Sequence, residues 1–376
     1  MPEALVTPNS LIWARQRAGL SEAYMADALK VKIERVKMWE SGEARPTFKQ
    51  AQKWASKTYI PFGFLFLREP PSENLPIPDL RTLGGAALTR PSLNLLDTVR
   101  DVLRKQAWYK EYLLENSAEL CQFVGKFSLQ STVFEVVEDM KHSLGFDQSR
   151  PVPSHDDYLR ELINAAESLG ILVMRSGIVG NNTSRKLDVG EFRGFAISDK
   201  HAPVIFINSA DAPSARLFTF IHELAHLWIG SSGISTAGLN QNHLEEQFCN
   251  KVAGEFLVPL AMLIRLFDER ASLTENVLKI TNTFKVSKLV ALRRLVDIQK
   301  ISNDQYSTAY LEELRYFSNL AGSGGSFYRN SVVKNSRRFS KAILSETFRG
   351  KVLLRDAASL LGVQPSKLKS YAESVS

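Results

Sequence analysis

The chain has 376 residues, 44% of them hydrophobic, and carries a formal net charge of +7. This length predicts two to three domains, and this hydrophobic content is sufficient for packed cores. The amino terminus shows no basic-then-apolar leader, and apolar stretches such as residues 62–67 are far too short to span a bilayer, so we expect neither secretion nor a membrane span. Only Cys121 and Cys249 are present, which favours a reducing, cytoplasmic location. The positive charge favours a polyanionic partner.

The first 60 residues predict a series of short helices. Residues 10–18 form an amphipathic segment, and Ser21 is placed to cap a second helix that ends at Leu29. Residues 33–41 predict a third helix, and Pro46-Thr47-Phe48 opens a fourth. Helices this short, with small residues at their crossing points, indicate a helix-turn-helix.

The third of these helices ends in W-E-S-G, from Trp39 to Gly42. Residues 8–60 as a whole resemble the Cro/repressor-type (XRE-like) helix-turn-helix, whose third helix lies in the major groove of DNA. With Ile33, Val36 and Trp39 facing the core, the remaining side chains of this helix and its flank would face bases or phosphates. These candidate DNA-binding residues are Lys30, Lys32, Glu34, Arg35, Lys37 and Met38.

Two properties of this face restrict what it is expected to read. Its lysines add affinity more than base recognition, and Glu34 repels phosphate unless it meets a cytosine amino group. A solvated basic helix on a domain that has lost DNA binding is therefore the alternative interpretation.

A proline-rich segment separates this unit from the rest of the chain. Residues 67–80 carry four prolines and predict an extended connector. Beyond it, amphipathic helices are predicted at the following residues: 93–114, 131–144 and 158–169.

Three short strands are predicted around the centre of the chain. Residues 171–174, 192–197 and 203–208 combine β-branched and aromatic residues and predict a small sheet. One of these strands is a candidate for binding an extended peptide by β-augmentation. The alternative is that all three only cover the helices that follow, and the sequence leaves both options open.

The most informative pattern is H-E-L-A-H at residues 222–226, within an otherwise apolar segment. Histidines four positions apart share one helix face and can bind the same metal ion, and the carboxylate at the second position points toward water at the metal. Glu223 is then the candidate general base. The alternatives are a chance match and a buried histidine pair satisfied by backbone carbonyls.

Catalytic zinc keeps three protein ligands and one open position, so a third ligand must come from another element. Residues 230–242 form a Ser/Gly/Asn-rich break, and residues 243–258 predict a second helix that ends before Pro259. We choose Glu246 as the third ligand, with Asn250 one turn later to hold a ligating imidazole in its required tautomer. The competing third ligands are His243, Glu245 and Glu255.

The run H-E-L-A-H-L-W-I-G followed by E-Q-F-C-N-K-V-A-G-E-F-L-V-P resembles the ImmA/IrrE family of zinc metallo-endopeptidases. The His-His-Glu spacing also resembles that of thermolysin-like proteases. The resemblance implies that His222, His226 and Glu246 bind one Zn²⁺ and that Glu223 is the base. It places Asn250 in the family's E-x-x-[AC]-N position, and it implies a zincin-like fold and a regulatory protein as substrate.

The chain beyond Pro259 is predicted to be helical again. Residues 277–296 predict a helix-turn-helix-like pair. After a glycine- and serine-rich break at residues 321–326, residues 333–339 add positive charge, and residues 353–371 predict a second pair around Gly362. Such pairs either dock on nucleic acid or complete the fold, and we favour the second option.

These observations predict an α+β, mainly helical chain in four parts. A helix-turn-helix DNA-binding domain covers residues 1–66, and a Pro-rich connector covers residues 67–90. An ImmA/IrrE-like metallopeptidase domain with a small β-sheet covers residues 91–300, and a helical region covers residues 301–376.

The predicted function is that of a cytoplasmic, zinc-dependent endopeptidase that binds DNA through its amino-terminal domain. The resemblance implies that it cleaves a repressor or an antitoxin and so controls stress, mobile-element or defence genes. No membrane partner is expected, and a homodimer is left open. The rival hypotheses are a transcriptional regulator with a non-catalytic peptidase fold and an antitoxin that acts by binding a toxin.

Overall fold

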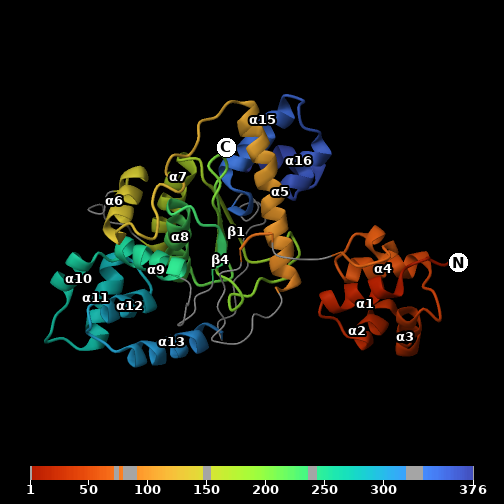
Figure 1. The fold of residues 1–376 in the computed structure, drawn as a ribbon, viewed down its shortest axis with the longest axis horizontal. Coiled ribbons are helices and arrows are strands. Elements are labelled where there is room, and N and C mark those ends of the chain that lie inside the picture. The colour runs from red at the N-terminus through yellow and green to blue at the C-terminus, as the bar shows by residue number, and fades with distance from the viewer. Residues whose placement is uncertain are drawn as a thin grey trace. The chain divides into compact units, whose positions relative to one another are not determined.

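The computed structural model describes residues 2–71, 76–78, 91–146, 154–235, 244–318 and 333–375. The chain divides into two compact units, Met1–Asn74 and Leu75–Ser376. Within the described residues the second unit combines a small sheet with many helices, and the first is helical (Figure 1). The predicted fold class, α+β and mainly helical, is confirmed.

The first unit is a bundle of short helices around two tryptophans. Trp39 and Trp54 are buried and meet edge to face, with ring centroids 6.2 Å apart. Arg15 and Glu40 form an ion pair at 2.6 Å that joins the first and third helices. The helices are α1 (Pro8–Arg17), α2 (Glu22–Leu29), α3 (Ile33–Ser41) and α4 (Phe48–Lys57), followed by the 3-10 helix η1 (Phe62–Phe66).

The second unit is built on a four-stranded sheet with the order β1-β3-β2-β4. β1 runs parallel to β3, whereas β2 is antiparallel to both of its neighbours. The strands predicted at residues 192–197 and 203–208 are interior strands, so β1 and β4 occupy the edges of this sheet. The strands are β1 (Leu172–Ser176), β2 (Gly194–Ile197), β3 (Val204–Asn208) and β4 (Gly233–Ser235).

The break predicted at residues 230–242 contains β4, which the sequence did not reveal. Residues 236–243 lie outside the described part of the chain. A three-residue strand within a Ser/Gly-rich segment has too few residues to show an alternating pattern. It is recognised as a strand only because it pairs with β2.

Alternating side chains of the strands enter two different cores, as the period of two residues in a strand requires. Val173, Ile205 and Ile207 pack into one core with α7 and α8. Met174 and Phe206 pack into the other with α5 and the carboxy-terminal helices. α7 and α8 accordingly lie on one side of the sheet and α5 on the other (Figure 1).

The helices on the first side of the sheet include the pair that contains the predicted metal ligands. They are α6 (Val133–Ser143), α7 (His155–Ser168), α8 (Pro213–Trp228), α9 (Leu244–Leu257), α10 (Leu260–Leu266), α11 (Leu273–Phe284) and α12 (Lys288–Asp297), and α13 (Asn303–Ser318) packs on α12. The other core contains α5 (Leu93–Glu115), α15 (Arg337–Phe348), α16 (Leu354–Leu361), the 3-10 helix η2 (Pro365–Lys367) and α17 (Leu368–Val375). Among the described helices, none is long and apolar enough to cross a membrane.

Candidate metal centre

α8 is a buried helix that crosses the first face of the sheet. Pro213 occupies its first turn, where the missing N–H is not needed, and Gly230 follows its end with a positive φ of 73°. Every residue from Phe220 to Trp228 is buried. The histidines and glutamate of this segment are therefore removed from water, which costs free energy unless they have partners or a ligand.

The structure brings the three predicted ligands together at one point. Nε2 of His222 lies 3.1 Å from Nε2 of His226. The Glu246 carboxylate on α9 reaches both rings, at 3.3 Å from His222 and 3.1 Å from His226. Ligand atoms of these buried residues all lie within 4.8 Å of one another. Two imidazoles and a carboxylate in this arrangement are a donor set that suits a divalent transition metal.

Glu223 lies beside this cluster and is completely buried. Neither of its carboxylate oxygens has a hydrogen-bond partner among the described residues. Burial raises the pKa of Glu223 to about 8 and Glu246 raises it further, whereas His222 and the nearby Ser235 hydroxyl, which lies outside full hydrogen-bond geometry, lower it. A buried, unpartnered carboxyl group in this position is able to take up and release a proton near neutral pH.

The charges of the three clustered residues are coupled. Burial alone would raise the pKa of Glu246, but the two histidines lower it well below its ordinary value. Burial opposes protonation of His222, yet the charge of Glu246 raises the pKa of that ring above its usual range. Burial lowers the pKa of His226, so this ring is held neutral. An anionic carboxylate and a neutral imidazole are the forms that bind a metal ion, so Glu246 and His226 already favour these forms, whereas His222 would have to release a proton when a metal binds.

The other residues proposed for this site have separate positions. Asn250 lies close enough to His222 for its side chain to act as a hydrogen-bond partner that raises the histidine pKa. Glu245 accepts a hydrogen bond from Ser231 Oγ at 2.7 Å, and Glu255 pairs with Arg294. Neither Glu245 nor Glu255 belongs to the cluster of ligand atoms. His243 lies outside the described residues.

Two residues of the site were missed by sequence reasoning. Ser235, at the end of β4, donates a hydrogen bond from Oγ to Glu246 Oε1 at 3.2 Å. Gly194 begins β2, and a Cβ there would lie 2.7 Å from Glu223 Oε1 and 2.9 Å from the Phe206 carbonyl oxygen. Any larger residue at position 194 would force the Glu223 carboxylate or the strand to move. Both roles depend on strand pairing, and no local pattern in the sequence signals them.

Three models of known families match parts of the chain. A family model described as the IrrE N-terminal-like domain, Peptidase_M78, matches residues 166–296. A helix-turn-helix family model matches residues 11–65. The chain joins a helix-turn-helix domain to an IrrE N-terminal-like peptidase domain. A third model, a domain of unknown function (DUF8813), matches residues 335–374. No curated protein matches the chain.

The helix-turn-helix domain presents the predicted DNA-facing residues at its surface. Val36 and Trp39 of α3 are buried, as predicted. Met38 is half-buried, and the other side chains proposed to face DNA are exposed. The exposed residues are Lys30, Lys32, Glu34, Arg35 and Lys37. Lys37 lies 4.0 Å from Glu22, so one of these charges is partly offset within the domain.

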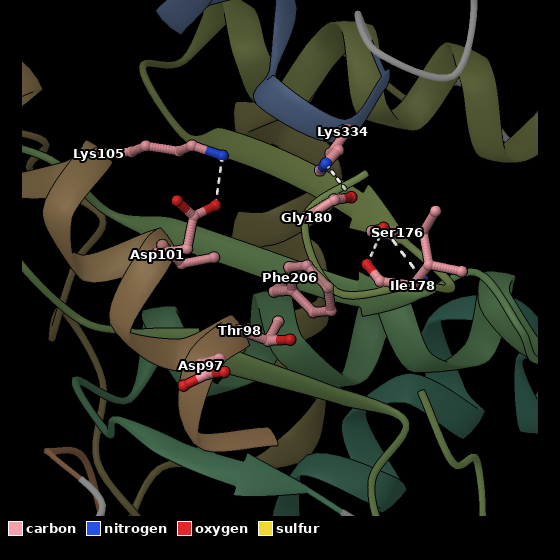
Figure 2. Close-up of a pocket in the computed structure, with 10 residues that line it drawn as sticks. Asp97, Thr98, Asp101, Lys105, Ser176, Ile178, Gly180, Phe206 and Lys334 are labelled. Atoms are coloured by element: carbon pink, nitrogen blue, oxygen red, sulfur yellow. Dashed lines mark hydrogen bonds and ion pairs between the residues drawn. The ribbon is translucent and has the colours of Figure 1, made fainter. Parts of the chain in front are cut away.

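A second buried polar cluster lies on the other face of the sheet, around a cavity of about 20 Å³ lined by residues of α5, β1 and the carboxy-terminal region. The Lys105 ammonium group points at the Asp101 carboxylate, 2.6 Å away (Figure 2), and donates to Asn335 Oδ1 at 2.9 Å. Lys334 donates to the Gly180 carbonyl (Figure 2) and also to Asn181 Oδ1 at 2.9 Å. Both ammonium groups therefore have partners within the fold, and this cluster connects α5 to the carboxy-terminal helices.

Proposed function

We propose that the chain is a zinc-dependent endopeptidase that carries its own DNA-binding domain. The observation that carries this proposal is the convergence of His222, His226 and Glu246 in the interior, with an unpartnered Glu223 carboxylate beside them. A structural histidine pair would be satisfied by backbone carbonyls, whereas here each histidine Nε2 faces the other and the Glu246 carboxylate.

The donor set fits zinc in number and type. Structural zinc sites use four protein ligands, and catalytic sites use three and leave one position for water or substrate. His222 and His226 would supply nitrogen ligands and Glu246 an oxygen ligand. The hydrogen bond from Ser235 to Glu246, and Asn250 beside His222, would hold two of these ligands in orientation.

The chain's own residues account for the proton transfers of amide hydrolysis. Zinc in this site would polarise a peptide carbonyl and make water more acidic. Glu223 accepts a proton from water as the water oxygen bonds to the carbonyl carbon. The same carboxyl group then gives that proton to the amide nitrogen as the carbon–nitrogen bond breaks, so one residue serves as base and then as acid. The absence of a side chain at Gly194 leaves space for this carboxylate.

The substrate that we propose is a regulatory protein, either a repressor or an antitoxin. The support for it is the fusion of the two domains and the resemblance to ImmA/IrrE peptidases, because a DNA-binding domain would place the protease near proteins bound at the same genes. Cleavage would then control stress, mobile-element or defence genes. We also retain as a proposal the four-part division at residues 66, 90 and 300, and a cytoplasmic site of action.

The first test is metal content measured by elemental mass spectrometry on the purified chain and on His222→Ala. We expect about one zinc per chain in the wild type and its loss in the variant. Lys251→Ala is the matched control, because Lys251 is exposed on the same helix as Glu246 and is expected to leave zinc in place. A wild-type chain that binds no zinc when zinc is supplied would contradict the proposal.

A second experiment separates catalysis from the two binding hypotheses. Glu223→Gln removes the proposed base and keeps all three ligands. If regulation in cells is lost while zinc and DNA binding remain, the chain acts as a protease. If regulation is unchanged, the chain acts by binding DNA or a toxin, and the peptidase proposal is wrong.

A further inference from the structure

The carboxy-terminal helices carry a concentration of positive charge. Residues 335–376 contain eight lysines and arginines and three acidic residues, a net charge of +5. Residues 75–334, which include the metal centre, contain 28 basic and 29 acidic residues, a net charge of −1. The positive charge of the second unit therefore resides in its last 42 residues, the region that matches a domain of unknown function.

α16 and its turn repeat the geometry of α2 in the helix-turn-helix domain, at a constant offset of 332 residues. α2 (Glu22–Leu29) and α16 (Leu354–Leu361) both have eight residues. Each is followed by a residue in the left-handed region, Lys30 with φ 57° and Gly362 with φ 66°. The next residue is a valine in both, and its N–H donates to the carbonyl of Ala26 or Ala358 at 3.0 Å.

The helix after the turn keeps the same register. At the offset of 332 residues, buried Val36 corresponds to buried Leu368, and buried Trp39 corresponds to buried Tyr371. The exposed positions also correspond. Exposed Arg35 corresponds to exposed Lys367, and exposed Lys37 corresponds to exposed Lys369. The second helix pair therefore presents two cations at the positions where the first pair presents two.

The pair α11 and α12 shows that this correspondence is not a general property of helix pairs in the chain. Lys285 after α11 is also left-handed, with φ 52°. In α12, however, the positions equivalent to Arg35 and Lys37 are Val290 and Leu292, which are 6% and 4% exposed. This pair uses its second helix for the core, as expected for a pair that completes the fold, whereas α17 leaves the same face in solvent.

We propose that η2, α17 and the start of α16 form a second binding surface for double-stranded DNA. Lys367 and Lys369 would contact phosphates, as would Arg355 at the start of α16, whose side chain is 80% exposed and would exchange its surface ion pair with Asp356 for a phosphate. The exposed side chains of Gln364 and Ser366 lie at the start of the second helix, the part that meets base edges in a helix-turn-helix.

The choice of DNA as the ligand rests on the proposed DNA binding by the amino-terminal helix-turn-helix domain. It does not depend on peptidase activity. The exposed apolar side chains of Phe348, Leu353 and Leu354 would suit a protein partner instead. Duplex DNA is favoured for two reasons. The carboxy-terminal region has a strongly positive net charge, and Lys367 and Lys369 occupy the positions that correspond to the DNA-facing Arg35 and Lys37 of α3.

The test compares three full-length double variants, each of which removes two positive charges. Lys367→Ala/Lys369→Ala removes the proposed contacts, and Arg35→Ala/Lys37→Ala removes the corresponding residues of α3. Lys200→Ala/Lys279→Ala is the control, because both lysines are exposed and lie outside the pairs α2–α3 and α16–α17. Affinity for a mixed-sequence DNA duplex is measured by fluorescence anisotropy over a series of salt concentrations, with circular dichroism to check folding.

We expect Lys367→Ala/Lys369→Ala to lower the affinity about tenfold and to reduce the salt dependence, log K against log salt, by about two units. The control is expected to match the wild type. Loss in the carboxy-terminal variant alone would support the second surface and contradict DNA binding by α3, whereas loss in the α3 variant alone would overturn the inference and leave the proposed function intact.

Two further outcomes have a clear meaning. If the carboxy-terminal variant binds single-stranded DNA or RNA less well but binds duplex DNA as before, the inference is wrong. If Lys367→Ala/Lys369→Ala unfolds, Lys367→Gln/Lys369→Gln replaces it in the same comparison, because glutamine keeps most of the side-chain length without the charge. Unchanged duplex binding in Lys367→Gln/Lys369→Gln would contradict the inference. The exposed apolar side chains near α16 would then point to a protein partner.

Discussion

The two faces of the central sheet each carry a group of charged side chains, buried on the α8 face and partly buried on the α5 face, and the two groups differ in how they are satisfied. On the α8 face, both oxygens of Glu223 and Nδ1 of His226 have no hydrogen-bond partner among the described residues. On the α5 face, Lys105 is bonded to Asp101 and to Asn335. Buried polar groups that have partners stabilise a fold, whereas buried groups without partners indicate a place for a ligand or a reaction.

The largest effect is expected from Glu223→Gln on the α8 face. Removing a general base costs on the order of a thousandfold in kcat, and the amide keeps the shape of the side chain. Peptide hydrolysis should fall by about this factor while zinc content stays at the wild-type value. Equal hydrolysis by variant and wild type would show that the unpartnered carboxylate has no catalytic role.

On the α5 face the corresponding change affects stability and not chemistry. Lys105→Met removes the ammonium group and leaves Asp101 and Asn335 without their partner. We expect a loss of about 2 kcal/mol in the free energy of unfolding, which is less than for a fully buried pair because Asp101 is about one-third exposed.

Urea denaturation measures this loss, with zinc content and hydrolysis expected to be unchanged. Lys110→Met is the control, because the Lys110 side chain is 39% exposed in its pair with Asp199 and should contribute less than about 1 kcal/mol. If both variants lose the same stability, burial of Lys105 is not the cause.

Gly194→Ala tests the contact between the sheet and Glu223. The added Cβ meets Glu223 Oε1 and the Phe206 carbonyl at less than 3.0 Å, so the carboxylate or the strand must shift. We expect hydrolysis to fall about a hundredfold, because a displacement near 1 Å has that effect on a reacting group. Zinc content should not change, and Gly63→Ala, which meets no atom within 4 Å, is the matched control.

The smallest effect is a pH dependence on the α5 face. Burial and the nearby Lys105 lower the pKa of Lys334 to about 8 in the folded chain, below its ordinary value of 10.5. Between pH 8 and 10.5 the unfolded chain keeps this proton while the folded chain has lost it, so stability rises with pH across this window. Relative to Lys334→Met, the wild type should gain at most about 1 kcal/mol of unfolding free energy, because Lys334 is partly exposed. A difference that is constant across the window would show that this pKa is not lowered.

The sequence predicted the elements that local patterns define. The i, i+4 histidines and the apolar spacing of the following helix predicted α8 and α9, and the structure brings Glu246 to both histidines. The inward face of α3 was equally local, and Val36 and Trp39 are buried as predicted. These features need only helix periodicity and capping.

The features that the sequence did not predict depend on contacts between distant residues. Gly194 approaches Glu223 only because β2 packs against α8, and Lys105 finds Asn335 at a separation of 230 residues. A single sequence contains no signal for such pairings, because each partner is an ordinary residue in its own segment.

The outer edge of β4 is already occupied by the chain itself. The N–H of Ile234 donates to the Pro78 carbonyl at 3.1 Å, and the neighbouring Ile77 is buried in the core on the α5 face. A peptide that added to the sheet at this edge would need the same N–H. Such a guest strand would have to displace residues 76–78, so the segment that follows the helix-turn-helix domain would compete with a substrate for the same backbone group.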